Sequence, residues 1–234
     1  MLASIFSLNV IQTALELGCI YALVALALFL SYSILNIADL STDGCFTLGC
    51  AVACQVALTG HPFLALLAAV VIALAGAAMV GFLGTRLGLS IRATGDNAAM
   101  VRASSINPAF TITVGLCISG ALTALSGGLL AQYQKSCDIN VGTGMVTIAL
   151  ASLIIGETLV GKRTMVRRVL GVVFGSCLYR FIVAVALRFN VPAAAMKLVS
   201  AIIVAVAISM PAIREKIAFE KRRNAARQAR KERV

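Results

Sequence analysis

The sequence predicts an all-α fold, a polytopic bundle of helices that crosses a membrane several times. The composition is 60% hydrophobic and only 12% charged, whereas soluble domains carry about a quarter charged residues. The mean hydropathy is +0.98. Several apolar runs approach or exceed the ~20 residues that a helix needs to cross ~30 Å of hydrocarbon. These runs are long and rich in Ala and Leu, which favours helices over strands.

About seven membrane segments are expected, and one of them is interrupted by polar residues. We expect residues 1–213 to form the transmembrane domain and residues 214–234 to form a basic cytoplasmic tail. Gly120, Gly127 and Gly128 give one segment the small residues that allow helices to pack closely. The segments cover about residues 10–35, 45–58, 63–83, 109–130, 145–160, 169–187 and 198–213.

The net charge is +11, and the positions of the basic residues along the chain indicate a membrane topology. The basic residues concentrate in the stretch 85–108, in the loop 162–168 and in the tail, which lie an even number of crossings apart. The opposite loops hold only Lys135, Arg188 and Lys197. The positive-inside rule therefore predicts a multi-pass protein of the cell membrane, in contact with lipid, with a cytoplasmic C-terminus. No nucleic-acid partner is expected, because no aromatic platform or reading motif accompanies the charge.

The side of the N-terminus depends on the second segment. Seven full crossings place the N-terminus outside, whereas a re-entrant second segment places it inside. The polar interruption before that segment holds Asp39 and Asp43. One interpretation is a broken helix that lines a substrate pathway, since irregular backbone inside a membrane is tolerated where it is buried or faces water. The other is an interfacial turn in which the acids cap helices.

The stretch 85–108 predicts a short amphipathic helix on the cytoplasmic side. Gly95 can end one element, and Asp96 or Asn97 can cap a helix that runs to about Ser105, before Asn107 and Pro108. Such a helix suits docking of a soluble partner, and an ordinary surface helix is the alternative. The side chains available for contact are Ile91, Arg92, Asp96, Met100, Val101, Arg102 and Ile106.

No enzyme chemistry is predicted, so we expect no catalytic residues, cofactor or metal. The sequence has no phosphate-binding loop, and its single His leaves no hydrolase triad. The seven cysteines do not follow zinc or iron–sulfur spacing and are interpreted as small packing residues. The alternative class is an ion-coupled secondary transporter that uses the intramembrane acids Glu16, Asp39, Asp43 and Glu157.

Several stretches carry a resemblance to a known family. They are residues 18–23 and 34–44, residues 87–97 continued by Met100, Ala103, Ile106 and Asn107, and residues 125–134 and 150–157. The Gly95-Asp96-Asn97 motif is the most specific of them. These stretches resemble the permease subunits of ATP-binding-cassette importers, in the branched-chain amino acid and ribose-type permease group, and are most similar to its tryptophan/tyrosine-type branch.

The resemblance implies an inward-moving permease for a small polar solute, an amino acid or related compound. It implies a second permease copy in a homodimer, cytoplasmic ATP-binding subunits that hydrolyse ATP, and an extracytoplasmic substrate-binding protein. It also assigns roles to two sets of residues. Coupling to the ATPase falls to Arg92, Gly95, Asp96, Asn97, Met100, Arg102 and Ile106. The translocation pathway includes Asp39, Ser41, Thr42, Asp43 and Gly44.

Two features depart from the family pattern. Family members usually carry Gly just before the position of Ile106, where this chain has Ser105. Family members also continue through two further membrane segments after the position of Thr85, whereas here Thr85 and Arg86 lead directly into the coupling stretch. The chain is therefore expected to be shortened internally, which leaves a degenerate, non-transporting permease as a further alternative.

Overall fold

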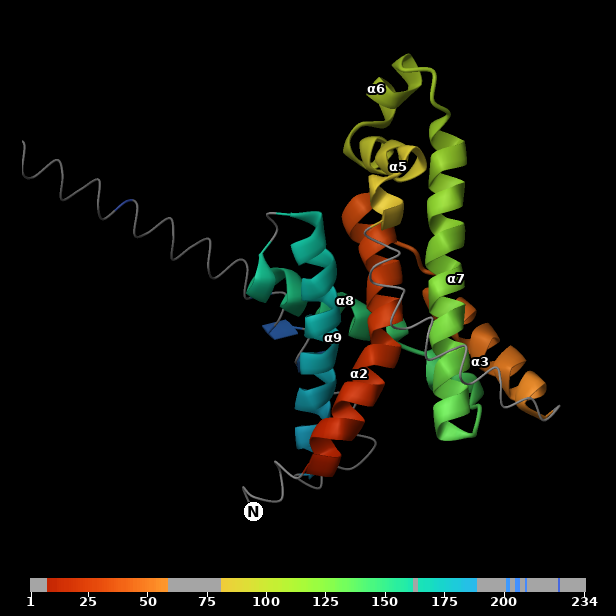
Figure 1. Cartoon of the computed structure of the whole chain (residues 1–234), viewed down its shortest axis with the longest axis vertical. Helices are drawn as coiled ribbons and strands as arrows, with labels where there is room; N and C mark the ends of the chain where they lie inside the picture. Colours follow the sequence, from red (N-terminus) through yellow and green to blue (C-terminus); the bar gives the residue numbers. More distant parts are fainter. Residues whose placement is uncertain are drawn as a thin grey trace, which may run out of the picture.

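The computed structural model describes residues 8–58, 81–161 and 164–188, with Ala201, Ile202, Ala205, Val206, Ser209 and Arg223. Every regular element in this described part is helical (Figure 1). The elements are α2 (Leu8–Leu28), the π-helix η1 (Phe29–Ile34), α3 (Thr42–Leu58), α5 (Arg86–Asp96), α6 (Ala98–Ala103), α7 (Pro108–Gln134), the 3₁₀ turn η2 (Ile139–Gly142), α8 (Met145–Val160) and α9 (Met165–Arg188).

Four stretches of the described chain are long and apolar enough to cross a membrane: Val10–Ile34, Pro108–Gln134, Ile139–Val160 and Met165–Leu187. The predicted all-α membrane bundle is confirmed, and the total of seven segments stays a prediction. The expected segments at 63–83 and 198–213 and the basic tail lie largely outside the described residues.

The bundle is built around α2 and η1. In the most apolar stretch of Val10–Ile34, 78% of the residues are buried, against 33–44% in the other three spans. Helices α7, α8 and α9 all pack against α2. The apolar residues from Ile20 on α2 to Leu30 on η1 are therefore all buried by the surrounding helices. A helix that is apolar on all sides belongs in such a central position.

The bundle has two ends that differ in what they carry. At one end the amide of Asn36 donates to the carbonyl of Gly95 at 3.1 Å, which joins the end of η1 to α5. We call this the α5–α6 end. At the other end, the hydroxyl of Tyr133 near the end of α7 donates to the carboxylate of Glu16 at 3.1 Å. We call this the Lys135 end, after the C-cap residue of α7.

The chain reverses at Asn36 and returns along α7 toward the Lys135 end. Asn36 has φ of 55°, a left-handed conformation that Asn tolerates well. Residues 36–41 are not helical, and α3 starts only at Thr42. Contacts with α7 then advance in step along both segments. In order, the contacting pairs are Leu35 with Gly115, Asp39 with Ser119, Gly49 with Ala124 and Ala53 with Gly128.

This path agrees with a broken second segment rather than a re-entrant one. A re-entrant segment would bring the chain back to the α5–α6 end, but α3 continues toward the end where α7 finishes. Helix α3 is 17 residues long, or about 25 Å at 1.5 Å per residue. The non-helical residues 36–41 precede it, and Asp39 among them lies beside Ser119 of α7.

Glycine allows the closest helix contacts. A Cβ added to Gly127 would lie 2.1 Å from the carbonyl oxygen of Phe46 on α3. Between α8 and α9, a Cβ added to Gly156 would lie 2.1 Å from the carbonyl oxygen of Gly171. These distances are far below van der Waals contact, so the backbones meet where no side chain intervenes. Small residues at crossing points are the expected way to pack helices in a membrane.

We therefore expect Gly127→Val to destabilise the bundle, because the added side chain forces α3 away from α7. Overpacking of this kind costs about 1–3 kcal/mol or more. The measurement is the thermal unfolding midpoint of the purified protein in detergent. Gly120→Ala is the control, since its Cβ would lie 3.5 Å from the sulfur of Cys45, an ordinary contact. Equal midpoints for the two variants would contradict the packing described here.

Candidate coupling and translocation site

The stretch 85–108 folds into two short helices, each with a side-chain cap. The hydroxyl of Thr85 accepts from the amide of Gly88 at 3.3 Å and starts α5. The side chain of Asn97 accepts from the amides of Ala99 and Met100 at 3.0 and 3.2 Å and starts α6. The predicted cap at Asn97 is confirmed. The sequence did not predict α5 as a helix.

The predicted boundaries of this stretch need two corrections. Gly95 was expected to end an element, but it lies within the last turn of α5, which continues to Asp96. The helix ends one residue later because Asn97 is extended, with φ of −159°. Helix α6 was expected to run to Ser105 and ends at Ala103. Ser105 has φ of 61°, a left-handed conformation that stops the helix.

Helix α5 is anchored to the bundle by one face. Ile91 is fully buried in the apolar cluster at the end of α2 and η1. A Cβ added to Gly95 would lie 1.8 Å from the carbonyl oxygen of Ile34, so the two backbones are in direct contact. The hydroxyls of Thr94 and Thr111 are 2.8 Å apart and join α5 to α7. This anchor ties α5 to the residues immediately before the chain reversal.

The opposite face of α5 and the tip of α6 are open. Figure 1 shows α6 at the extreme end of the molecule, beyond α5 and the start of α7. Val101 is buried and holds α6 in place, while Met100 beside it is 70% exposed. Of the predicted coupling residues, Gly95 and Ile106 are partly buried. Those with exposed side chains are Arg92, Asp96, Asn97, Met100 and Arg102.

Asp39 lies inside the bundle, where the non-helical residues pass α7. Its side chain is buried, and it accepts from the amide of Ser41 at 2.9 Å and from the hydroxyl of Ser119 at 3.4 Å. The hydroxyl of Ser119 also donates to the carbonyl of Ala27 on α2 at 3.1 Å. Thr42, also buried, donates to the Asp39 carbonyl at 3.0 Å. The pathway role predicted for Asp39, Ser41 and Thr42 stays a prediction.

Asp43 caps α8, a helix far away in sequence. One carboxylate oxygen accepts from the amide of Gly144 and the other from the amide of Val146, each at 3.1 Å. An acid at a helix N-terminus satisfies free amides and interacts favourably with the helix dipole. The sequence left two interpretations of Asp43 open, and the structure shows the one in which it caps a helix. Gly44, next to it, is exposed and has open space around its Cα.

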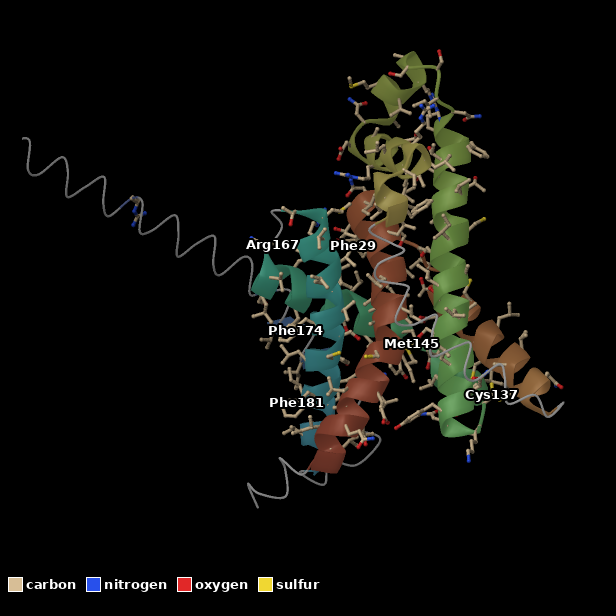
Figure 2. The ribbon with its side chains drawn as sticks, in the orientation of Figure 1. Phe29, Cys137, Met145, Arg167, Phe174 and Phe181 are labelled. Carbon is tan, nitrogen blue, oxygen red and sulfur yellow. The ribbon has the colours of Figure 1, made fainter. Side chains whose placement is uncertain are left out.

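An ion pair that sequence reasoning missed lies at the α5–α6 end. Arg168 donates to the carboxylate of Glu157 at 2.8 Å, and Ser33 donates to the same oxygen at 3.0 Å. Glu157 is only 8% exposed. The guanidinium of Arg168 also lies over the ring of Phe29, 5.0 Å from its centroid. Figure 2 shows Phe29 on the central helix and Arg167 near the turn between α8 and α9.

This pair corrects the expected position of Arg167 and Arg168. They were expected in a loop with Lys162 and Arg163, but they belong to the first turns of α9, which begins at Met165. The carbonyl of Thr164 accepts from the amide of Arg168, so the helix starts earlier than the apolar run. Lys162 and Arg163 lie outside the described residues. No sequence signal pairs Arg168 with Ser33, because 135 positions separate them.

Comparisons with known proteins assign the chain to a family. The family described as the permease component of the branched-chain amino acid transport system matches residues 82–208, more than half of the chain. The chain belongs to this permease family. The match includes α5, α6, α7, α8 and α9, and with them all seven predicted coupling residues. Residues 39–44 lie outside it.

Two relatives are similar to this permease. A tyrosine transport system permease protein from Clostridioides difficile (strain R20291) is 37% identical over 123 residues, which is 53% of this chain and 42% of that protein. An uncharacterised protein from Rickettsia prowazekii (strain Madrid E) is 22% identical over 274 residues, which is 86% of this chain and 98% of that protein. No solved structure matches. The matched part thus spans less than half of the tyrosine permease.

Ser105 gives a testable consequence of the αL conformation at the end of α6. Residues other than Gly, Asn and Asp adopt this conformation at a cost. We therefore expect Ser105→Gly to stabilise the protein by about 0.5–1 kcal/mol, after the greater freedom of unfolded Gly is subtracted. Ser104→Gly is the matched control. Ser104 has φ of −87°, so glycine relieves no left-handed strain there and is not expected to raise the stability. Thermal unfolding of both variants tests this, and a lower midpoint for Ser105→Gly would contradict it.

Proposed function

We propose that this permease is the membrane subunit of an ATP-binding-cassette importer that moves a small polar solute, an amino acid or related compound, inward. The observation that carries the proposal is the α5–α6 unit, which is open on its outer face and fixed through Gly95 to the end of the central helix. Such a unit suits the binding of a large soluble partner and the transfer of its movement to the bundle.

The partner that fits this surface is a cytoplasmic ATP-binding subunit. Arg92, Arg102 and Asp96 offer charges of both signs, and Met100 offers a flexible apolar side chain that adapts to a partner surface. The charge asymmetry of the sequence favours a cytoplasmic location for this end. A second permease copy and an extracytoplasmic substrate-binding protein complete the proposed assembly. The substrate-binding protein would deliver the solute at the Lys135 end.

Movement of α5 would act directly on the broken segment. Gly95 contacts Ile34, and Asn36 binds the Gly95 carbonyl, while Asp39 lies only three residues further on. A shift of α5 therefore displaces the chain reversal that leads into residues 39–44. ATP binding drives transport only if the ATP-binding subunits dock differently on the two permease states, since only differential binding shifts an equilibrium.

All four acids proposed for ion coupling have hydrogen-bond partners in the described structure. Asp39 accepts from Ser41 and Ser119. Asp43 caps α8, Glu157 binds Arg168, and Glu16 accepts from Tyr133. An ion-coupled carrier needs acids that exchange their partners during transport. These contacts favour the ATP-driven importer over the secondary transporter.

We expect Met100→Glu and Arg102→Glu to abolish co-purification of the ATP-binding subunit. The first places a charge at an exposed apolar contact, and the second reverses a charge on the same surface. Lys135→Glu makes the same charge change as Arg102→Glu at the opposite end and is expected to leave binding intact. The measurement is pull-down of the tagged permease co-expressed with the ATP-binding subunit of the same organism that binds the wild-type permease.

Three outcomes separate the alternatives. Loss of the subunit only in the α5–α6 variants supports the importer. Ion-driven uptake without any bound ATP-binding subunit contradicts it and indicates a secondary carrier. An intact complex whose ATP hydrolysis and uptake do not respond to any delivered solute indicates a non-transporting permease.

A further inference from the structure

Arg180 is a permanent positive charge within a candidate membrane span, Met165–Leu187. Arginine keeps its proton in proteins, so burial does not neutralise it. Charged residues in membrane segments are costly, face the protein interior or a polar cavity, and often mark substrate pathways. The proposed function gives this residue no role, and the described structure gives it no acidic partner.

The side chain of Arg180 points into the bundle. Its Cζ lies 3.3 Å from the centroid of the Tyr21 ring, and Tyr21 is only 7% exposed on the central helix. Four residues earlier, Ser176 donates to the carbonyl of Gly18 at 2.7 Å, so α9 is in direct contact with α2 here. Side chains on a helix lean toward its N-terminus, which directs Arg180 toward the middle of α9. Arg180 therefore does not extend toward the nearby end of the span.

Tyr21 balances the charge of Arg180 only in part. A ring face attracts the cation, but the guanidinium N–H groups still need acceptors in their own plane. Within the described chain, the buried Nε of Arg180 has no hydrogen-bond partner, and neither has the buried hydroxyl of the adjacent Tyr179. Arg168, on the same helix, shows the contrasting case, since it binds Glu157 at 2.8 Å. Arg180 is thus stacked on Tyr21, and no described carboxylate binds it.

We infer that Arg180, stacked on Tyr21, binds the carboxylate group of the transported solute. The planar fork of a guanidinium matches the two oxygens of a carboxylate, and such bidentate pairs are strong where water is scarce. Tyr21 lies five residues further along α2 than Glu16, which Tyr133 binds at the Lys135 end. This inference rests on the proposed function and narrows its solute to a compound that carries a carboxylate.

The test compares pairs of probes that differ only in the carboxylate. L-Tyrosine is compared with tyramine, and L-leucine with isoamylamine, by thermal unfolding of the full-length permease in lipid nanodiscs. We expect an amino acid to raise the midpoint of the wild-type protein and its matching amine to leave it unchanged. Stabilisation by the amine as large as that by the amino acid would overturn the inference, and so would no stabilisation by either amino acid.

Variants then locate the effect. Arg180→Gln should weaken the apparent affinity for the stabilising amino acid at least tenfold, and Arg180→Lys, which keeps the charge without the fork, should weaken it less. Arg167→Gln is the control, since it removes an exposed arginine from the same helix and should bind like the wild type. Equal affinity in Arg180→Gln and wild type would overturn the inference. If Arg180→Gln does not fold, Arg180→Lys is compared with Arg167→Gln instead. Equal affinities of these two variants for the stabilising amino acid would overturn the inference.

These readouts do not depend on the ATP-binding subunit. Failure of that subunit to bind would contradict the proposed importer and would leave the difference between acid and amine intact. Conversely, ATP-driven uptake that Arg180→Gln leaves unchanged would support the importer and overturn the carboxylate site.

Discussion

The contact between Gly95 and the carbonyl of Ile34 is the constraint on which the rest of the arrangement depends. Two backbones can approach this closely only where one residue has no side chain. The contact fixes α5 at the end of the central helix, and α5 in turn positions Asn97, the cap that starts α6. Ile34, the other partner of this contact, is the last residue of the π-helix η1. The chain reversal at Asn36 and the non-helical residues 36–41 follow it directly. The exposed surface and the interrupted segment are thus neighbours in space, although the contacting residues Asn36 and Gly95 are 59 positions apart in sequence.

Two acidic side chains in the bundle have partners that offset the free-energy cost of removing them from water. A buried charge without a partner is expensive, because the interior cannot replace the solvation that water provides. Glu157 is bound by Arg168 and Ser33, and Asp43 is bound by two backbone amides at the start of α8. The first set of contacts holds η1, α8 and α9 together, and the second holds α3 and α8 together. Against this background, Arg180 differs because, among the described residues, its guanidinium stacks on the Tyr21 ring and binds no acid.

Several features could be predicted from the sequence because they depend on local patterns. Long apolar runs predicted the spans, the polar residues around Asp39 predicted the interruption, and Asn97 predicted a helix cap. Helix α5 was missed because Gly88, Thr94 and Gly95 are weak helix formers. Its helical conformation depends on tertiary contacts, chiefly burial of Ile91 and the hydroxyl pair of Thr94 with Thr111.

The ion pair of Glu157 and Arg168 with Ser33 could not be read from the sequence for a related reason. The three residues come from α8, α9 and η1, and only the packing of these helices brings them together. The same applies to the cap that Asp43 provides for α8, which joins residues about 100 positions apart. Local patterns identified both acids as notable, but their partners depend on how the helices pack.

In the proposed importer, the Gly95 contact transmits movement of the α5–α6 surface to the interrupted segment. The most direct test is the ratio of solute uptake to ATP hydrolysis in liposomes that contain the complete transporter. Gly95→Ala forces α5 away from Ile34, so the account predicts that the ATP-binding subunits stay bound while uptake per ATP falls at least tenfold. Gly84→Ala, at a glycine with open space around it, should keep the wild-type ratio. An unchanged ratio in Gly95→Ala, with α5 demonstrably displaced, would contradict the account.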